Sequence, residues 1–321
     1  MRCPFLALVM LGALVGVPAL GQEYPNRPIR VVVPYPPGGS TDVVARQIGQ
    51  SLQEALHQPV VIENRGGASG MIGAEVVARA APDGYTLLMT ASGPHAINVS
   101  LFPTVPYDPV RSFTPIVLTA VYPLLMVTPA DRQPRTVAEF IAHARANPGR
   151  VNYCSIGPGT PSHLAGELFR SMAGIEMTHV PYRGSGPAVT DTVAGVCDVL
   201  FDSALSSGPH ARQGRLRALA VSTAQRVASW PELPTVAEAG LPGYEAYTWT
   251  ALVAPAGVTG EVVARLNAEV NAILQSAHFR EQLEAQGAVP GGGTPQELAA
   301  FTEREVRKWA EVIRAGDIKA E

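Results

Sequence analysis

An apolar strand, a glycine-rich loop and an amphipathic helix follow one another between residues 29 and 56, and this order constrains the fold more than any other feature. Residues 29–33 are β-branched apart from Arg30, which is typical of a buried strand in a parallel sheet. After the loop "VPYPPGGSTD", residues 33–42, apolar residues recur every four positions, and this period predicts a helix that begins near Asp42. These apolar residues are Val44, Ile48, Leu52 and Leu56.

The loop before this helix has the composition of an anion-binding turn. Glycine lets the backbone approach a ligand closely, and Ser40, Thr41 or Asp42 can cap the helix. Unpaired N–H groups and the positive end of the helix dipole meet at the same place, which favours a negatively charged ligand. The alternative is a turn in which Gly and Pro serve only the geometry of the chain. For this loop taken alone, both interpretations stay open.

The same unit returns at residues 150–172, "RVNYCSIGPGTPSHLAGELFRSM". A strand again leads through Gly, Pro and Thr into a helix that places Leu164, Leu168 and Met172 on one face. Open α/β sheets bind ligands at the carboxyl ends of their strands, where both loops are expected. If the two loops belong to different lobes, an anion between them would be held from both sides.

Strand and helix patterns alternate along nearly the whole chain, which predicts an α/β fold with mostly parallel sheets flanked by helices. Residues 113–129 contain three prolines, so we expect two successive strands there rather than a spanning helix. Residues 244–257 form a second extended stretch. If these stretches are crossings, one lobe comprises residues 22–121 and 247–321, the other comprises residues 122–246, and the two connections suit hinge closure. Alternatively, their Gly and Pro residues are ordinary turn residues.

The first 21 residues have the pattern of a cleaved signal peptide. Arg2 precedes an apolar stretch at residues 5–17, and Ala19 and Gly21 stand where a signal peptidase reads small residues. A membrane anchor is the alternative, but the stretch is short and Pro18 breaks it. No cysteine directly follows the stretch, so a lipid anchor is not supported. We therefore expect a soluble exported protein that begins at Gln22.

Charge and cysteine content exclude several classes of function. A formal net charge of −3 without a basic run gives no reason to expect nucleic acid as a partner. The two cysteines after the leader, Cys154 and Cys197, could form a disulfide in an oxidising compartment or remain as buried free thiols. Neither has a neighbouring His, and the seven histidines lack the spacing of metal ligands. We expect neither a metal nor a cofactor.

Short motifs of common enzyme classes are missing from the sequence. We find no G-x-S-x-G nucleophile motif, no H-E-x-x-H motif, and no nucleotide-binding glycine pattern in the first loop. Ser69 in "GGASGM" is offset from the nucleophile pattern. An exported α/β hydrolase, or another enzyme acting on a small carboxylate, is therefore kept only as the alternative to a binding protein, and we expect no enzymatic activity.

Five long segments carry a resemblance to a known family. They are "YPNRPIRVVVPYPPGGSTDVVARQIGQSL", "VIENRGGASGMIGAEVVARAAPDGYTLL", "YCSIGPGTPSHLAGELF", "HVPYRGSGPAVTDTVAGVCDVLFDS" and "LRALAVSTAQRVASWPELPTVAEAGLPGYE". Together they resemble the Bug family, the periplasmic substrate-binding receptors of tripartite tricarboxylate transporters. The resemblance implies a two-lobed periplasmic binding protein, type II-like, that captures a small organic carboxylate in its cleft and delivers it to integral membrane subunits. We expect it to act as a monomer.

In that family, backbone N–H groups and small hydroxyls from both lobes hold the ligand carboxylate, often through waters. Asp42 is better suited to cap its helix than to meet an anion. Arg183 stands where Lys is usual and could hold a carboxylate bidentately, with a solvated surface Arg as the alternative. Ser69 and Cys154 stand where Gly is frequent. The resemblance implies ligand-binding roles for Tyr35, Gly39, Ser40, Thr41, Asp42, Ser69, Gly70, Ser92, Ser155, Gly157, Gly159, Thr160, His163, Arg183, Asp202 and Ser203. It leaves the identity of the carboxylate open.

Overall fold

The computed structural model of the protein describes residues 24–319, so the expected signal peptide lies outside the described residues. Strands and helices alternate along this part of the chain, as predicted. The strands are β1 (Ile29–Val33), β2 (Val60–Asn64), β3 (Thr86–Ala91), β4 (Phe113–Pro129), β5 (Val151–Ser155), β6 (Met177–Pro181), β7 (Val199–Ser203), β8 (Leu216–Val221), β9 (Tyr247–Pro255) and β10 (Val289–Gly292).

Helices fill most of the chain between these strands. The α-helices are α1 (Ser40–Leu56), α2 (Met71–Ala78), α3 (Asn98–Leu101), α4 (Val137–Ala146), α5 (Pro161–Ala173), α6 (Ser185–Val193), α7 (Ala204–Arg212), α8 (Gly260–Gln275), α9 (Ala277–Ala285) and α10 (Pro295–Ala315). A 3₁₀ turn, η1 (Ala68–Gly70), and a π turn, η2 (Gly93–Ile97), complete the list. Within residues 24–319, no helix is long and apolar enough to cross a membrane.

The ten strands of the described chain form two groups that share β4. Eight of them follow the order β2-β1-β3-β9-β4-β7-β5-β6, and β8 and β10 also pair with β4. In the first strand group, β1 pairs in parallel with β2 and β3, while β9 runs antiparallel to β3 and β4. In the second strand group, β5 pairs in parallel with β6 and β7, while β7 and β8 run antiparallel to β4. In each group, the strands far from β4 pair in parallel, and the pairs that involve β4 or β9 are antiparallel.

Residues 113–129 form one continuous strand, which corrects the expectation of two successive strands. The first part of β4, Phe113 to Pro123, pairs with β9, and the part from Leu124 to Pro129 pairs with β7 and β8. Register shifts at Pro115/Val117 and Leu118/Ala120 let the strand bend and continue where a proline would otherwise end the pairing. The lobe boundaries at residues 121/122 and 246/247 stay a prediction, and β4 changes partners at this point of the chain.

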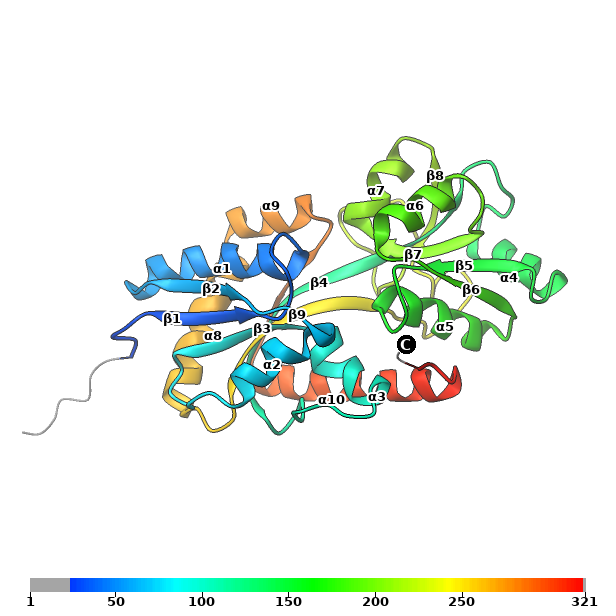
Figure 1. Ribbon diagram of the computed structural model, residues 1–321. Coiled ribbons are helices and arrows are strands. Elements are labelled where there is room, and N and C mark those ends of the chain that lie inside the picture. The colour runs from blue at the N-terminus through cyan, green and yellow to red at the C-terminus, as the bar shows by residue number, and fades with distance from the viewer. Residues whose placement is uncertain (1–23, 320–321) are drawn as a thin grey trace, which may run out of the picture.

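The strands β4 and β9 run from one half of the molecule into the other, as Figure 1 shows. The last helix, α10, lies under the first strand group, and its C-terminal end reaches α5 in the other half (Figure 1). Trp249 on β9 and Trp309 on α10 are both fully buried, and both indole N–H groups donate to Glu305 Oε2 at 3.0 Å. This packing fixes α10 across the crossing strands.

Candidate functional site

A cavity of about 440 Å³ lies where the two strand groups meet. It is lined by Tyr35, Pro36, Pro37, Gly39, Ser40, Thr41, Ala91, Leu124, Ile156, Pro161, Ser162, Ser185, Asp202, Ser203 and Thr248. These residues come from both strand groups and from both crossing strands. The cavity therefore occupies the place that the two glycine-rich loops predicted for a ligand.

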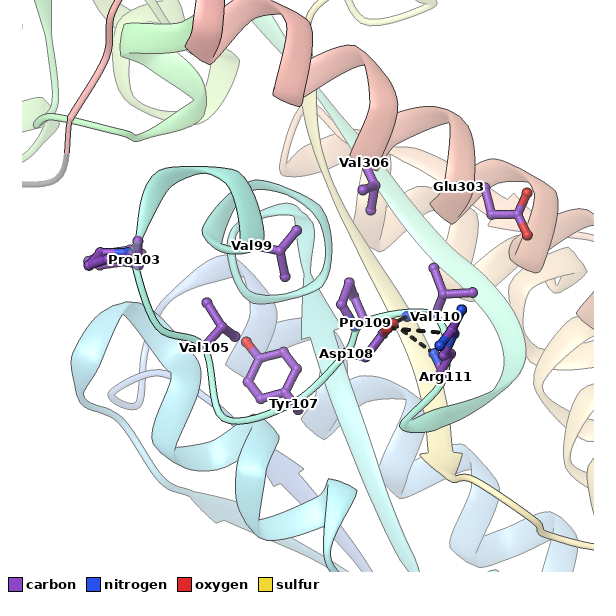
Figure 2. A pocket seen from close by; sticks show the side chains of 11 residues that line it. Val99, Pro103, Val105, Tyr107, Asp108, Pro109, Val110, Arg111, Glu303 and Val306 are labelled. Atoms are coloured by element: carbon purple, nitrogen blue, oxygen red, sulfur yellow. Dashed lines mark hydrogen bonds and ion pairs between the residues drawn. The ribbon is translucent and has the colours of Figure 1, made fainter.

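A second hollow, of about 550 Å³, lies between residues 99–111 and α10 (Figure 2). Apolar side chains line it together with Asp108, Arg111 and Glu303. Asp108 Oδ1 accepts hydrogen bonds from the backbone N–H groups of Val110 and Arg111, so its carboxylate is occupied by its own loop. We place the site in the smaller cavity because both strand groups and four helix N-termini border it, whereas one segment and one helix border the larger hollow.

The N-terminus of α1 forms the side of the cavity that belongs to the first strand group. Gly39 is the N-cap residue with extended backbone, φ −77° and ψ 166°, and it offers no side chain, which corrects the expectation that Ser40, Thr41 or Asp42 caps the helix. The N–H of Val43 donates to the Gly39 carbonyl oxygen. The three N–H groups before it form no hydrogen bond within the described chain, and two of them belong to the lining residues Ser40 and Thr41.

Asp42 braces this loop instead of lining the cavity. Its buried carboxylate accepts hydrogen bonds from the Gly38 N–H at 2.9 Å, from Arg46 Nε at 3.0 Å and from Asn64 Nδ2 at 2.9 Å. Burial acts to raise the pKa of Asp42, but these hydrogen bonds and the Arg46 charge outweigh it and hold the pKa below its usual range. The carboxylate therefore stays ionised and keeps the loop in position.

Three further helices point their N-termini at the cavity from the second strand group. Pro161 and Ser162 begin α5, Ser185 begins α6, and Ser203 is the N-cap of α7. Ser203 Oγ accepts from the Ser206 N–H and so caps α7. With α1, four helix dipoles converge on one cavity, and this arrangement favours a negatively charged ligand.

Asp202 is the carboxylate that lines the cavity. Its side chain is buried, with Oδ1 accepting from Ser185 Oγ at 2.7 Å and Oδ2 accepting from Ser207 Oγ at 2.6 Å. Burial raises the pKa of Asp202, while the hydrogen bonds from Ser207, Ser185 and the Ser203 N–H oppose this shift. Asp202 thereby links the N-termini of α6 and α7.

The crossing strands form the floor between these two sides. Leu124 lies on β4, at the position where the strand changes partners, and Thr248 lies on β9. Ser92, which follows β3, shares a hydrogen bond of 2.9 Å with the Thr248 hydroxyl. Ser92 thus supports a lining residue but is not itself part of the lining.

The predicted residues of the second loop support α5 from behind the cavity. Thr160 is the N-cap of α5, where its hydroxyl accepts from the His163 N–H and donates to the Gly157 carbonyl oxygen at 2.7 Å. The Gly159 N–H donates to His163 Nδ1 at 3.0 Å. Ser155 Oγ is 2.7 Å from His179 Nε2, and the His163 and His179 rings stack with centroids 3.9 Å apart. None of these residues lines the cavity.

Three other predicted residues lie further from the cavity. Ser69 has a left-handed backbone, φ 52°, and its carbonyl oxygen accepts from Asn98 Nδ2. Gly70, with φ 87°, packs against Pro34 and Pro94. The Arg183 side chain is exposed and forms no ion pair with a described residue. Ligand-binding roles for these three residues stay predictions.

The sequence prediction and the cavity lining share Tyr35, Gly39, Ser40, Thr41, Asp202 and Ser203. The prediction missed Pro36, Pro37, Ala91, Leu124, Ile156, Pro161, Ser162, Ser185 and Thr248. Several of these missed residues lie inside the loops that the sequence pattern identified. The predicted residues beside them could therefore have indicated that they line the cavity. Leu124 and Thr248 had no such signal, because they belong to long strands with ordinary strand composition.

Cys154 and Cys197 form a disulfide, with their Cα atoms 5.7 Å apart. Cys154 lies on β5 and Cys197 lies just before β7, and these strands are paired neighbours. The bridge therefore holds the strands that carry the second loop and Asp202.

The sequence matches the model of a transporter receptor family over residues 44–318; the family is described as the tripartite tricarboxylate transporter family receptor. A protein from the tcbD-tcbE intergenic region of Pseudomonas sp. (strain P51) is 43% identical over 291 residues, which cover 90% of this chain and 86% of that protein. Protein BugT of Bordetella pertussis is 39% identical over 310 residues, which cover 96% of this chain and 95% of that protein.

Solved structures show the same similarity. An R. palustris protein with adipate has a TM-score of 0.79 and 39% identity, covering 92% of this chain and 99% of that chain. MatC from Rhodopseudomonas palustris with bound malate has a TM-score of 0.74 and 35% identity, covering 90% of this chain and 100% of that chain. The periplasmic binding protein BugD has a TM-score of 0.74 and 32% identity, covering 93% of this chain and 100% of that chain.

Proposed function

Because this chain belongs to the tripartite tricarboxylate transporter receptor family, we propose that its cavity captures a small organic carboxylate and that the protein delivers it to a membrane transporter. The relatives BugT and BugD confirm the resemblance to the Bug family of periplasmic binding proteins. None of the relatives or structures described above supports the hydrolase alternative.

The convergence of four helix N-termini on one cavity carries this proposal. Each of the helices α1, α5, α6 and α7 has a residue at its N-terminus that lines the cavity. Backbone N–H groups at such positions bind carboxylate oxygens, and the partial positive charges of four dipoles add. A volume of about 440 Å³ lies in the range of sites for small molecules. Adipate and malate in two related structures support a dicarboxylate as the ligand.

Most of the ligand-binding roles predicted from the sequence fall into two kinds in this proposal. Residues of the lining contact the ligand, directly or through water. Thr160, Gly157, Gly159, His163 and Ser155 hold the α5 loop in the shape that the lining requires. Asp42 does the same for the α1 loop.

We propose that the protein returns its ligand unchanged, as a receptor does. It acts as a monomer with the membrane subunits of the transporter as partners, and it binds no nucleic acid. Export would remove residues 1–21, which sequencing the N-terminus of protein from the periplasmic fraction would check. Mass spectrometry of the ligand before and after incubation tests for turnover.

A thermal-shift panel of small carboxylates, cations and sugars tests the proposed function. At a ligand concentration 100 times the dissociation constant, binding should stabilise the fold by about 2.7 kcal/mol. We expect at least one carboxylate to raise the melting temperature and to give a saturable calorimetric titration. If no carboxylate shifts the melting temperature while a cation or a sugar does, the proposal is wrong.

A further inference from the structure

The polar and the apolar side chains of the cavity occupy different parts of its lining. Each polar lining side chain except Thr248 lies at the N-terminus of a helix, or in the loop or strand directly before that helix. Between these helix starts lies the cavity floor, formed by Ala91 at the end of β3, Leu124 on β4 and Thr248 on β9. The two walls are therefore rich in polar groups, whereas two of the three floor residues are aliphatic.

Leu124 presents only its side chain to a ligand. Its N–H donates to Ser222 Oγ at 2.9 Å, and its carbonyl oxygen accepts from the Ser222 N–H at 2.9 Å. Ala91 lies in the ladder between β3 and β9, opposite Thr250. The part of a ligand that lies on Leu124 and Ala91 therefore meets hydrocarbon.

Thr248 is the only floor residue with a hydroxyl among the described residues that line the cavity, and this hydroxyl shares a hydrogen bond of 2.9 Å with Ser92. A hydroxyl group on a ligand can donate one hydrogen bond and accept two, and in water it uses these positions. A bond to Thr248 would replace one of them. A ligand hydroxyl held over the floor thus loses hydrogen bonds that the cavity does not return.

The walls offer free N–H groups on both sides of this floor. The helices α1 and α6 begin after Gly39 and Gly184, and neither glycine provides a side-chain cap. The N–H groups of the lining residues Ser40 and Ser185 form no hydrogen bond within the described chain. A dicarboxylate with one carboxylate at each wall therefore lies with its middle segment over the floor.

We infer that the cavity selects against a polar group on the segment between the two carboxylates of its ligand, and that Leu124 and Ala91 determine this specificity. The inference rests on the proposed function, because it takes the ligand to be a dicarboxylate held at both walls. A substituent next to a carboxylate stays close to a wall, so the inference concerns substituents in the middle of the segment. Methyl and hydroxyl groups have similar sizes, and an apolar pocket separates such a pair by up to about a hundredfold.

Calorimetric titration of the full chain with matched diacids tests this inference. One series is glutarate, 3-methylglutarate and 3-hydroxyglutarate, and the other is adipate, 3-methyladipate and 3-hydroxyadipate. In at least one series, we expect the methyl acid to bind about tenfold or more tightly than the hydroxy acid, because only the hydroxyl group loses hydrogen bonds to water. The variant Leu124→Thr places a hydroxyl on the floor and should reduce this ratio to about threefold or less.

Leu118→Thr is the matched control. Leu118 lies on the same strand, opposite Ala251 of β9, and it does not line the cavity. This variant should keep the wild-type ratio. Circular dichroism and melting establish that each variant is folded. Ala91→Ser also adds a hydroxyl to the floor, with a smaller change of volume, and gives a second test if Leu124→Thr fails to fold.

The outcomes separate the inference from the proposed function. If the hydroxy acid binds as tightly as the methyl acid in both series, or if both lose the same affinity relative to the parent acid, the inference is wrong and the proposed function stands. The same holds if Leu124→Thr and Ala91→Ser keep the wild-type ratio. Binding of a monocarboxylate from the thermal-shift panel, without binding of any diacid, also overturns only the inference. If no carboxylate binds at all, the proposed function fails, and the inference falls with it.

Discussion

Two glycines that the sequence treats alike occupy different backbone conformations. Gly39 has an extended backbone, φ −77°, and a Cβ built there meets no atom within 4 Å. Gly157 has φ 140°, and its Cβ would lie 3.4 Å from the Tyr182 carbonyl oxygen. A side chain at Gly157 therefore strains the fold, while a side chain at Gly39 enters open space beside the first N–H groups of α1.

We expect Gly39→Val to fold normally but to bind a carboxylate at least about tenfold more weakly. The added methyl groups obstruct the approach of a carboxylate to the α1 N–H groups, and loss of hydrogen bonds to a charged group has this magnitude. Isothermal titration measures the affinity, and urea unfolding should show a loss of no more than about 1 kcal/mol, because Gly39 is an N-cap without a side-chain hydrogen bond. Gly157→Val should instead lose about 1 to 3 kcal/mol of stability because of backbone strain.

Arg183→Ala is the matched test of side-chain charge. Its exposed side chain lies outside the lining, so we expect an affinity within about threefold of wild type. If folded Gly39→Val binds normally while Arg183→Ala abolishes binding, a surface charge carries the affinity. The account of α1 as the anion-binding element would then be wrong.

His163 makes stability depend on pH. Burial lowers the pKa of His163 to about 4, and the His179 ring stacked on it acts in the same direction. The unfolded chain binds the proton near pH 6.5, so stability is complete above that pH and is lost as the pH falls toward 4. At about 1.4 kcal/mol per pH unit, the loss reaches at most about 3.5 kcal/mol.

His163→Asn should flatten this pH dependence. Asn can accept the Gly159 N–H bond as His163 Nδ1 does, but it does not titrate. Urea unfolding at pH 7 and pH 4.5 measures the difference in the wild type and in the variant. The buried His95, whose pKa burial also lowers to about 4, is present in both proteins and cancels. Equal losses in the two proteins would contradict the assignment to His163.

At the scale of elements, Thr160 shows how a helix start can be confused with a binding site. Its hydroxyl is occupied by the His163 N–H and the Gly157 carbonyl oxygen. We therefore expect Thr160→Ala to lower the free energy of unfolding by about 1 kcal/mol, as loss of an N-cap does, and to change carboxylate affinity less than Ser40→Ala does. Paired urea and calorimetric measurements on both variants check this. If Thr160→Ala loses more carboxylate affinity than Ser40→Ala does, the Thr160 hydroxyl belongs to the binding site.

The disulfide stabilises the parallel part of the second strand group. Cys154 and Cys197 are separated by 43 residues. Closing a loop of that length lowers the entropy of the unfolded chain and so raises its free energy by about 4 kcal/mol at 25 °C. Cys154→Ala with Cys197→Ala should lower stability by about 2 to 4 kcal/mol. Reductant should lower the urea midpoint of the wild type and leave that of the double variant unchanged. A wild-type midpoint insensitive to complete reduction would show that the bridge adds no stability.

Sequence patterns predicted where helices and strands lie better than they predicted which strands pair with one another. The periodicity of Val44, Ile48 and Leu52 is a local property, and the helix lies where it indicates. The continuity of β4 through Pro123 depends instead on pairing with β9 and β7, which are far away in the sequence. For the same reason the loops that border the cavity were predictable, but Leu124 and Thr248 were not: they reach the cavity only because distant strands cross there.

At the scale of the molecule, the two halves share core as well as strands. The largest hydrophobic cluster joins Val32 and Leu88 of the first strand group to Tyr153 and Phe201 of the second, with Trp249 among them. α10 adds a third connection through its contact with α5. Figure 1 shows that the two halves meet at β4, β9 and the end of α10. Any movement of the halves relative to each other must therefore pivot close to these elements.

We expect such a pivot to close the cavity around a bound carboxylate, because ligand groups on the α1 side and on the Asp202 side attract the two walls toward each other. Small-angle scattering should then show a smaller radius of gyration at saturation. A compact chain of this length has a radius of gyration of about 19 Å, and the radius of the ligand-free protein should exceed this value.

Ligand carried through purification would hide the change, so the protein is first unfolded, dialysed and refolded. Folded Gly39→Val is the control. It should keep the larger radius of gyration at the same carboxylate concentration, because this concentration lies below the dissociation constant of the variant. If calorimetry proves saturation and the wild-type radius does not change, the two crossings do not act as a hinge.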